Sequence, residues 1–218
     1  KMEVLNSYLE FNDAHNRNFR YVDVYFPEYD WINKRVLYQN FKKGNVKCPY
    51  EKRFYGAGYL GEGKYKSIDE NKNHTKCYNT WHDMLRRCYD KKYHKKHPTY
   101  KDCKVCENWL NFQNFARWYY ENYYEVDGEK MCLDKDILVK GNRIYSPYTC
   151  VFVPNRINVL FTKSDKNRGN NPIGVSLQDG KFISTCSIYD FDMKIKKRIY
   201  LGSVSYTHLR AHETSLHL

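Results

Sequence analysis

The sequence lacks any apolar run near the ~20 residues that a membrane-spanning helix requires, and no basic amphipathic helix stands out in it. Its first residues do not have the pattern of a secretory leader. We therefore expect neither a membrane partner nor export from the cell. No segment of the sequence indicates a protein partner.

Cysteine is sparse and irregularly spaced, with eight in 218 residues. This is below the density of a disulfide scaffold, so we expect free thiols in a reducing cytosol. One CxxC pair, Cys103 and Cys106, forms half of a zinc ribbon, and Cys88, His94 and His97 are the candidates to complete it. Because the sequence has no second CxxC, zinc is not expected.

Acidic side chains are in the minority: the sequence has 25 Asp and Glu and 37 Lys and Arg, which gives a net charge of +12. Basic side chains that neutralise phosphates release condensed counterions, which favours the binding of a polyanion. The aromatic fraction of 17% supplies bulky core material, and the length suits one ordinary domain or several small ones. Nucleic acid is therefore the first predicted partner.

The most informative segment predicts a strand, a turn, a second strand and a helix. It runs Leu133-Asp134-Lys135-Asp136-Ile137-Leu138, then Gly141-Asn142, then Tyr145-Ser146-Pro147-Tyr148-Thr149-Cys150-Val151-Phe152-Val153-Pro154, with Asn155 and Asn158 beyond. This order predicts that Asp134 on the first strand faces Asn158 on the helix. Oxygen ligands of this kind suit one Mg²⁺ or Mn²⁺ ion, which would hold a phosphodiester. The alternative is that both residues only cap a hairpin and a helix.

This segment resembles the metal-binding core of the HNH and HNN endonucleases of phages and mobile introns, over roughly residues 131–160 and more loosely from residue 78. The resemblance implies that Asp134 is the first metal ligand and Asn158 the ligand from the helix. Lys135 stands where these nucleases place the general-base His, and Thr149 stands where they place the middle Asn. The resemblance also implies a homing-type enzyme in the cytoplasm of a bacterial host.

The lysine at the base position has two possible roles. A general base works best with a pKa near the working pH, whereas a lysine in water has a pKa of ~10.4. Lys135 would therefore act as a base only after a large shift, or as a cation that stabilises charge at the scissile phosphate. If the base comes from elsewhere, His82, His94 and His97 are the candidates; the alternative for His94 and His97 is an exposed loop among lysines.

Two helices are predicted to pack on this strand pair. One begins at Thr80 and places Trp81, Met84, Leu85 and Cys88 on one face. The other runs from about Glu107 to Asn122, with an aromatic stripe that indicates a core rather than a base-stacking platform. The result is an α+β fold with a ββα-metal core over residues 76–162.

The segments before this core predict a small accessory module and a linker. Residues 18–54 are predicted to form a β-rich module, with strands over 21–26 and 34–38 and a basic edge that provides a second contact with phosphates; a solvated lysine cluster is the alternative. Residues 55–75 have the composition of a flexible linker with tyrosine anchors.

After a polar linker at 163–172, residues 172–203 predict three antiparallel strands. The Gly-Val opening, Phe182 and the Tyr-Leu-Gly close are similar to the Apetala/ethylene-response-factor type of DNA-binding domain. The resemblance implies that the sheet contacts double-stranded DNA through Lys181, Arg198 and Tyr200, and that a covering helix follows Gly202. Residues 204–218 instead resemble a translated sequencing adapter, so we expect a non-native tail and a truncated, poorly ordered sheet. In the same way, Lys1 before Met2 suggests upstream read-through.

The sequence thus predicts a DNA-binding, metal-dependent endonuclease. The departures at Lys135 and Thr149 favour an alternative, a catalytically degenerate DNA-binding protein or regulator that keeps the nuclease fold. An RNA-binding module whose tyrosines stack on single-stranded bases is a third possibility.

Overall fold

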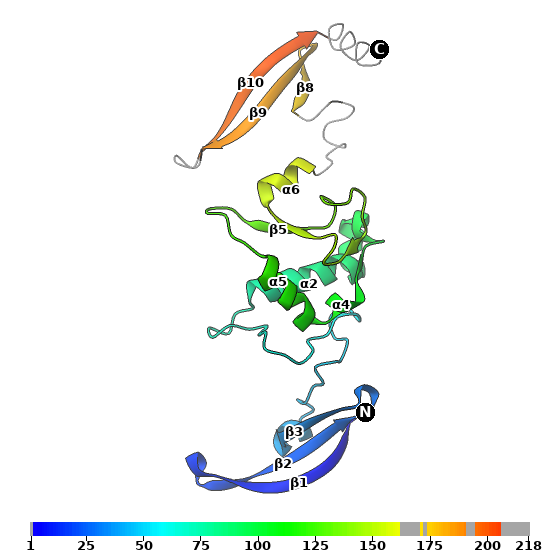
Figure 1. Ribbon diagram of the computed structural model, residues 1–218, viewed down its shortest axis with the longest axis vertical. Helices are drawn as coiled ribbons and strands as arrows, with labels where there is room; N and C mark the ends of the chain where they lie inside the picture. Colours follow the sequence, from blue (N-terminus) through cyan, green and yellow to red (C-terminus); the bar gives the residue numbers. More distant parts are fainter. Residues whose placement is uncertain (1, 162–170, 172–173, 191–194, 206–218) are drawn as a thin grey trace. The chain divides into compact units, whose positions relative to one another are not determined.

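The computed structural model describes residues 2–161, 171, 174–190 and 195–205, and the chain divides into two compact units, residues 1–160 and 161–218 (Figure 1). Both helices and strands are present, which agrees with the predicted α+β class. No helix in these described ranges has the length and apolarity to cross a membrane.

The first part of the chain forms a three-stranded antiparallel sheet with β2 in the centre. Its elements are β1 (Glu3–Asn12), η1 (Asp13–His15), β2 (Arg17–Phe26), η2 (Pro27–Tyr29), β3 (Trp31–Leu37) and α1 (Tyr38–Lys42). The strands and turn predicted over residues 21–38 are confirmed, but the sequence reasoning missed β1. A register shift between Val4 and Asn6 interrupts the alternation of β1 and explains the miss. Val22, Val24 and Phe26 pack with Val46 and Cys48 in a small core of their own.

The glycine-rich segment at 55–75 is a packed loop rather than a flexible linker. Phe54, Tyr55, Leu60 and Tyr65 all lie against the main core. The side-chain amide of Gln113 accepts from Tyr65 N at 3.0 Å and donates to Tyr65 O at 2.9 Å. The predicted tyrosine anchors are therefore confirmed, and the predicted linker is wrong.

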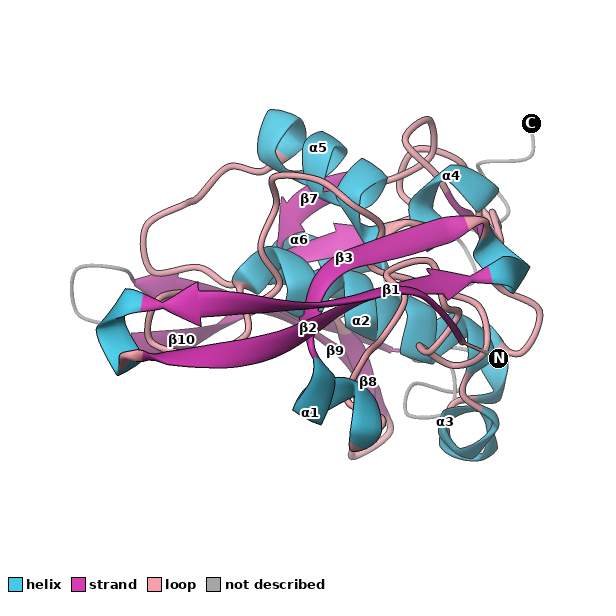
Figure 2. Ribbon diagram, turned by 90° about the horizontal axis from the view of Figure 1, so that it is seen from below, coloured by secondary structure: helices cyan, strands magenta, loops and turns pink. Residues whose placement is uncertain are grey.

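The helical layer follows this loop. It comprises α2 (Lys76–Tyr89), α3 (Lys91–Lys96), η3 (Pro98–Tyr100), α4 (Glu107–Leu110) and α5 (Phe112–Asn122). Figure 2 shows α3 as a separate short helix that follows α2, where the sequence predicted a loop.

Side-chain caps explain where the observed helix ends differ from the predicted ones. Helix α2 begins one turn before Thr80, because Thr75 Oγ1 accepts from Tyr78 N at 3.1 Å. The helix predicted over 107–122 is divided at Asn111, whose Oδ1 accepts from Gln113 N at 2.9 Å and starts α5.

Short strands complete the first unit. β4 (Lys104–Val105) pairs in parallel with β6 (Ile144–Tyr145), and β5 (Met131–Asp134) pairs antiparallel with β7 (Val151–Pro154), which leads directly into α6 (Asn155–Phe161). Of the two helices predicted to pack on this strand pair, α5 does so, because its Trp118 and Tyr119 contact the ring of Phe152 on β7. Residues of α2 belong to the same buried core. The main core is thus aromatic, with Trp81, Trp109 and Phe115 fully buried.

The second unit contains the three predicted antiparallel strands, β8 (Val175–Gln178), β9 (Lys181–Asp190) and β10 (Ile195–Ser205), with β9 in the centre. The predicted helix does not begin directly after Gly202: β10 continues to Ser205, the last described residue, and Val204 pairs with Phe182. The apolar face is partly open, because Phe182 is buried while Leu177 is 60% exposed and Val204 40% exposed. The predicted non-native tail lies outside the described residues from residue 206 onward.

Candidate metal and nucleic-acid site

Asp134 ends β5, and its carboxylate shapes the loop that follows. Oδ1 accepts hydrogen bonds from the backbone N of Asp136 at 2.7 Å and of Ile137 at 2.8 Å. This is an Asx-type turn, as expected if Asp134 caps the hairpin. The second oxygen, Oδ2, accepts no hydrogen bond from the part of the chain that the structure describes, so Asp134 retains one oxygen suited to a hard cation.

The strand places this carboxylate on the side of β5 that meets α6. Side chains two residues apart on a strand share a face, so Cys132 and Asp134 point the same way. The Sγ of Cys132 donates to Oδ1 of Asn155, the first residue of α6, at 3.4 Å. Asn158 lies three residues further along the same helix, about one turn away. Figure 1 shows α6 beside β5.

The next residue, Lys135, is buried rather than displayed to solvent, with 7% of its surface exposed. Its Nζ donates to Oδ2 of Asp136 at 2.6 Å and to the backbone O of Asn142 at 2.8 Å. The side chain of Asn142 in turn donates to the backbone O of Lys135 at 2.9 Å and of Ile144 at 2.7 Å. Lys135 and Asn142 therefore close the loop over residues 135–143 on itself.

Thr149 closes the second turn of the segment. Its hydroxyl Oγ1 donates to the backbone O of Ile144 at 2.8 Å and lies 2.8 Å from Oγ of Ser146. The backbone N atoms of Thr149 and Cys150 both donate to the O of Ser146. These bonds fix the Tyr-Ser-Pro turn before β7, so Thr149 has a structural role in this unit.

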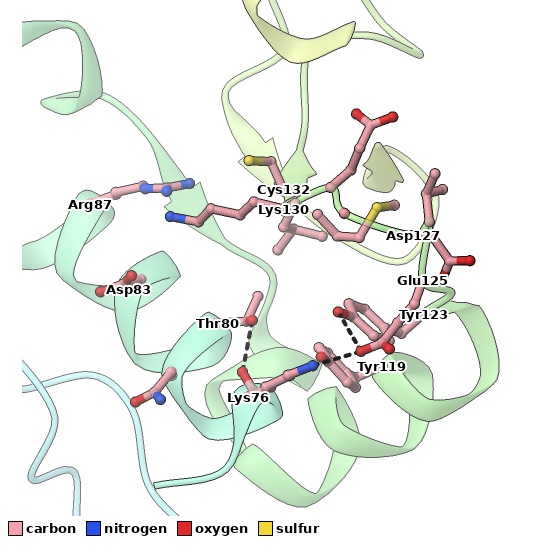
Figure 3. Close-up of a pocket in the computed structure, with 16 residues that line it drawn as sticks. Lys76, Thr80, Asp83, Arg87, Tyr119, Tyr123, Glu125, Asp127, Lys130 and Cys132 are labelled. Carbon is pink, nitrogen blue, oxygen red and sulfur yellow. Dashed lines mark hydrogen bonds and ion pairs between the residues drawn. The ribbon is translucent and has the colours of Figure 1, made fainter. Parts of the chain in front are cut away.

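A cleft of about 720 Å³ lies between α2, β5 and the loop that connects α5 to β5. The salt bridge of Lys76 to Glu125, 2.6 Å long, spans one part of its wall. Figure 3 shows the side chains of Arg87 and Lys130 pointing toward one another in another part, close to Cys132. Two cationic groups that face the same space favour an anion there.

The guanidinium of Arg87 lies near the Tyr145 hydroxyl, so that each group influences the pKa of the other. Burial raises the pKa of the Tyr145 hydroxyl above its usual value, and the neighbouring guanidinium opposes that shift. The Tyr145 hydroxyl thus stays neutral at physiological pH beside Arg87, a cation at the wall of the cleft. The sequence reasoning missed Arg87, because its pairing with Tyr145 joins distant segments.

The candidate histidines form other contacts. His82 Nε2 lies 3.3 Å from the Tyr55 hydroxyl, and burial lowers the pKa of His82. His94 is half-buried and its Nε2 lies 2.8 Å from the backbone O of Arg87. The ring of exposed His97 stacks on Tyr93 at 4.4 Å. The prediction of an exposed loop is thus wrong for His94.

The residues predicted to contact DNA in the second unit lie on one face of its sheet. Tyr200 pairs with Thr185 and Arg198 pairs with Ser187, so Arg198 and Tyr200 share the face of β9 on which Lys181 lies. All three predicted contact residues are exposed.

Neither comparisons with known proteins nor a search for clustered metal ligands assigns a family or a metal site to the chain. No family model, curated protein or solved structure matches the chain. Among the described residues, no group of three or more His, Cys, Asp or Glu side chains is arranged to hold a metal ion. Asp134 and Asn158 do not form a group of this kind, because they are two residues and one of them is an amide.

Proposed function

We propose that the chain is a DNA-binding endonuclease that cuts phosphodiester bonds with one divalent metal ion, held by Asp134 and Asn158. The observation that carries the proposal is the contact of Cys132 with Asn155, because it turns the Asp134 face of β5 toward the helix that bears Asn158. The order of β5, β7 and α6 supports it, as does the net charge of +12.

The donor atoms fit a hard cation. Asp134 offers Oδ2, and Asn158 offers an amide oxygen; both are ligand types that Mg²⁺ and Mn²⁺ accept, with water completing the shell. When bound, such an ion would polarise the phosphoryl oxygen and stabilise charge that develops on it. Arg87 and Lys130, which point into the cleft that β5 borders, are suited to bind other phosphate oxygens of the substrate.

In this proposal Lys135 positions the site and does not act as the base. Its ammonium already donates to Asp136 and to Asn142 O, and it is almost completely buried. A group so engaged holds Asp134 and the 135–143 loop in a fixed geometry. The proton of the attacking water would then pass to a second water or to a side chain other than Lys135.

The second candidate is a DNA-binding protein that keeps the nuclease fold without catalysis. The engagement of Lys135 and the structural bonds of Thr149 favour it, because neither position offers a free base or ligand. Both candidates predict salt-dependent binding to duplex DNA, and only the first predicts cutting.

Plasmid nicking in Mg²⁺ or Mn²⁺ separates the two candidates. We expect Asp134→Asn, which keeps an acceptor for the Asp136 and Ile137 amides, to lower the cutting rate by about 100-fold or more, since a metal ligand loses its charge. Asn158→Ala is expected to do the same, whereas Glu70→Gln, a change at an exposed acid in the segment before α2, leaves the rate unchanged. Binding to DNA without any cutting supports the non-catalytic candidate. Equal cutting by all variants rules out Asp134 and Asn158 as the site.

A further inference from the structure

Six exposed lysines lie on and just after α3: Lys91, Lys92, Lys95, Lys96, Lys101 and Lys104. We refer to them as the α3 lysine surface. The six residues of α3 read Lys-Lys-Tyr-His-Lys-Lys, which places all four lysines outward and leaves Tyr93 and His94 half-buried beneath them. None of the six lysines forms an ion pair with a residue that the structure describes.

The acidic residues near this surface already have other partners. Asp90 caps α3 by accepting from Lys92 N at 2.8 Å, Asp102 pairs with Arg143 at 2.6 Å, and Asp136 pairs with buried Lys135. The charge of the six lysines is therefore not neutralised locally. Such a concentration of one sign attracts a polyanion.

The backbone of α3 beneath the lysines is held in place by side-chain contacts. His94 Nε2 lies 2.8 Å from Arg87 O, and the Tyr93 ring contacts the guanidinium of Arg86 at 5.1 Å and the ring of Tyr100 at 6.0 Å. These contacts fix the backbone that carries the lysines, so their positions are set before a ligand arrives and less ordering is needed on binding.

The same surface adjoins the candidate nuclease loop. Lys104 N donates to Arg143 O at 2.8 Å, and β4 pairs with β6 through Lys104 and Ile144. Arg143 follows Asn142, whose backbone O accepts from Lys135. The α3 lysine surface therefore continues into the 135–143 loop, which begins at Asp134.

We propose that the α3 lysine surface binds the phosphate backbone of duplex DNA and holds it against the 135–143 loop. This inference rests on the proposed function and names a binding surface for its substrate. The chemistry favours a duplex. A membrane-surface helix needs an outward apolar face, and a single-strand reader needs exposed rings, but α3 presents only lysine ammonium groups outward while Tyr93 and Tyr100 are half-buried.

The test compares two variants with the same loss of charge. One carries Lys91, Lys92, Lys95 and Lys96 changed to Gln; the matched control carries Lys52, Lys64, Lys66 and Lys72 changed to Gln, all exposed and in the segment before α2. Duplex affinity is measured by fluorescence anisotropy across a salt series. Because each phosphate contact contributes a slope of about 0.9 in log K against log salt, we expect the α3 variant to lower the slope by about 2–4 and the control by less than ~1.

Equal slopes for the two variants overturn the proposal. So does tighter α3-dependent binding to phosphatidylserine vesicles or to single-stranded DNA than to the duplex. Circular dichroism confirms that the variants are folded. The two proposals can fail separately. If the α3 variant lowers the salt slope but cutting does not depend on Asp134, the lysine surface is supported and the nuclease site is ruled out. If cutting depends on Asp134 but the slope is unchanged, the nuclease site is supported and the lysine surface is ruled out.

Discussion

The ammonium of Lys135 lies 2.6 Å from the carboxylate of Asp136, its neighbour in the chain, and is buried beneath the loop that the two residues begin. A lysine that the sequence offers as a catalytic group thus joins the two ends of the loop over residues 135–143.

Replacement of Lys135 by Met is expected to lower the free energy of unfolding by about 1–3 kcal/mol. The change keeps the apolar stem but leaves Asn142 O and Asp136 without their charged donor. Urea denaturation measures the effect, and Lys140→Met, at an exposed position in the same loop, serves as the control. Equal stabilities of the two variants would show that the ammonium does not hold the loop.

Tyr145→Phe is expected to cost about 1–2 kcal/mol of stability. The buried hydroxyl that it removes lies beside the guanidinium of Arg87, and that charged group then loses a polar neighbour. Tyr148→Phe is the matched control, because Tyr148 belongs to the same turn and is 88% exposed. A loss no larger than that of the control contradicts the assigned role of Tyr145.

Stability is expected to fall at alkaline pH. Burial raises the pKa of Cys77, Cys88 and Cys150 to about 12 in the folded protein, whereas a thiol in the unfolded chain has a pKa of about 8.5. A raised folded pKa contributes stability that is fully present below pH ~8.5 and is lost as the pH rises toward the folded value.

Each thiol contributes a slope of at most ~1.4 kcal/mol per pH unit in that window. Urea denaturation at increasing pH measures the slope. The Cys77→Ala variant should reduce it by one thiol's share, because any cost of the cavity does not depend on pH. An unchanged slope in this variant argues against the role of Cys77.

Gly58→Ala is expected to destabilise the protein by about 1–3 kcal/mol. A Cβ at this position would overlap Leu85 Cδ1 and lie 3.0 Å from Trp81 Cζ2, and both neighbours are fully buried. The double variant with Leu85→Val makes room for the methyl group, so its loss should be smaller than the sum of the single losses by more than ~0.5 kcal/mol. Thermal denaturation measures the coupling, and strict additivity would show that the overlap is relieved in another way.

The sequence predicted those features that depend on local periodicity. The buried face of α2, the aromatic stripe of α5, and the three strands of the second unit follow from spacing alone, and the structure confirms them. Helix ends were predicted less well. The sequence offers both Thr75 and Thr80 as a start for α2, and the structure uses Thr75; Asn111 starts a new helix inside the predicted 107–122 helix.

What the sequence did not predict depends on contacts between distant residues. The burial of Lys135 requires that Asn142 close the loop, and Arg87 lies beside Tyr145, which comes from another segment. No periodic pattern encodes such pairs. The roles predicted for Asp134, Asn158, Lys181, Arg198 and Tyr200 remain predictions, and the plasmid-nicking experiment tests those of Asp134 and Asn158.

The packing of the 55–75 loop sets a practical limit on how the molecule can be divided. Composition suggests a cut before α2, yet a fragment that starts at Lys76 would lose Phe54, Tyr55, Leu60 and Tyr65 from the aromatic core, together with the partner of Gln113. The smallest autonomous piece able to display Asp134 in its folded setting must therefore start before Phe54.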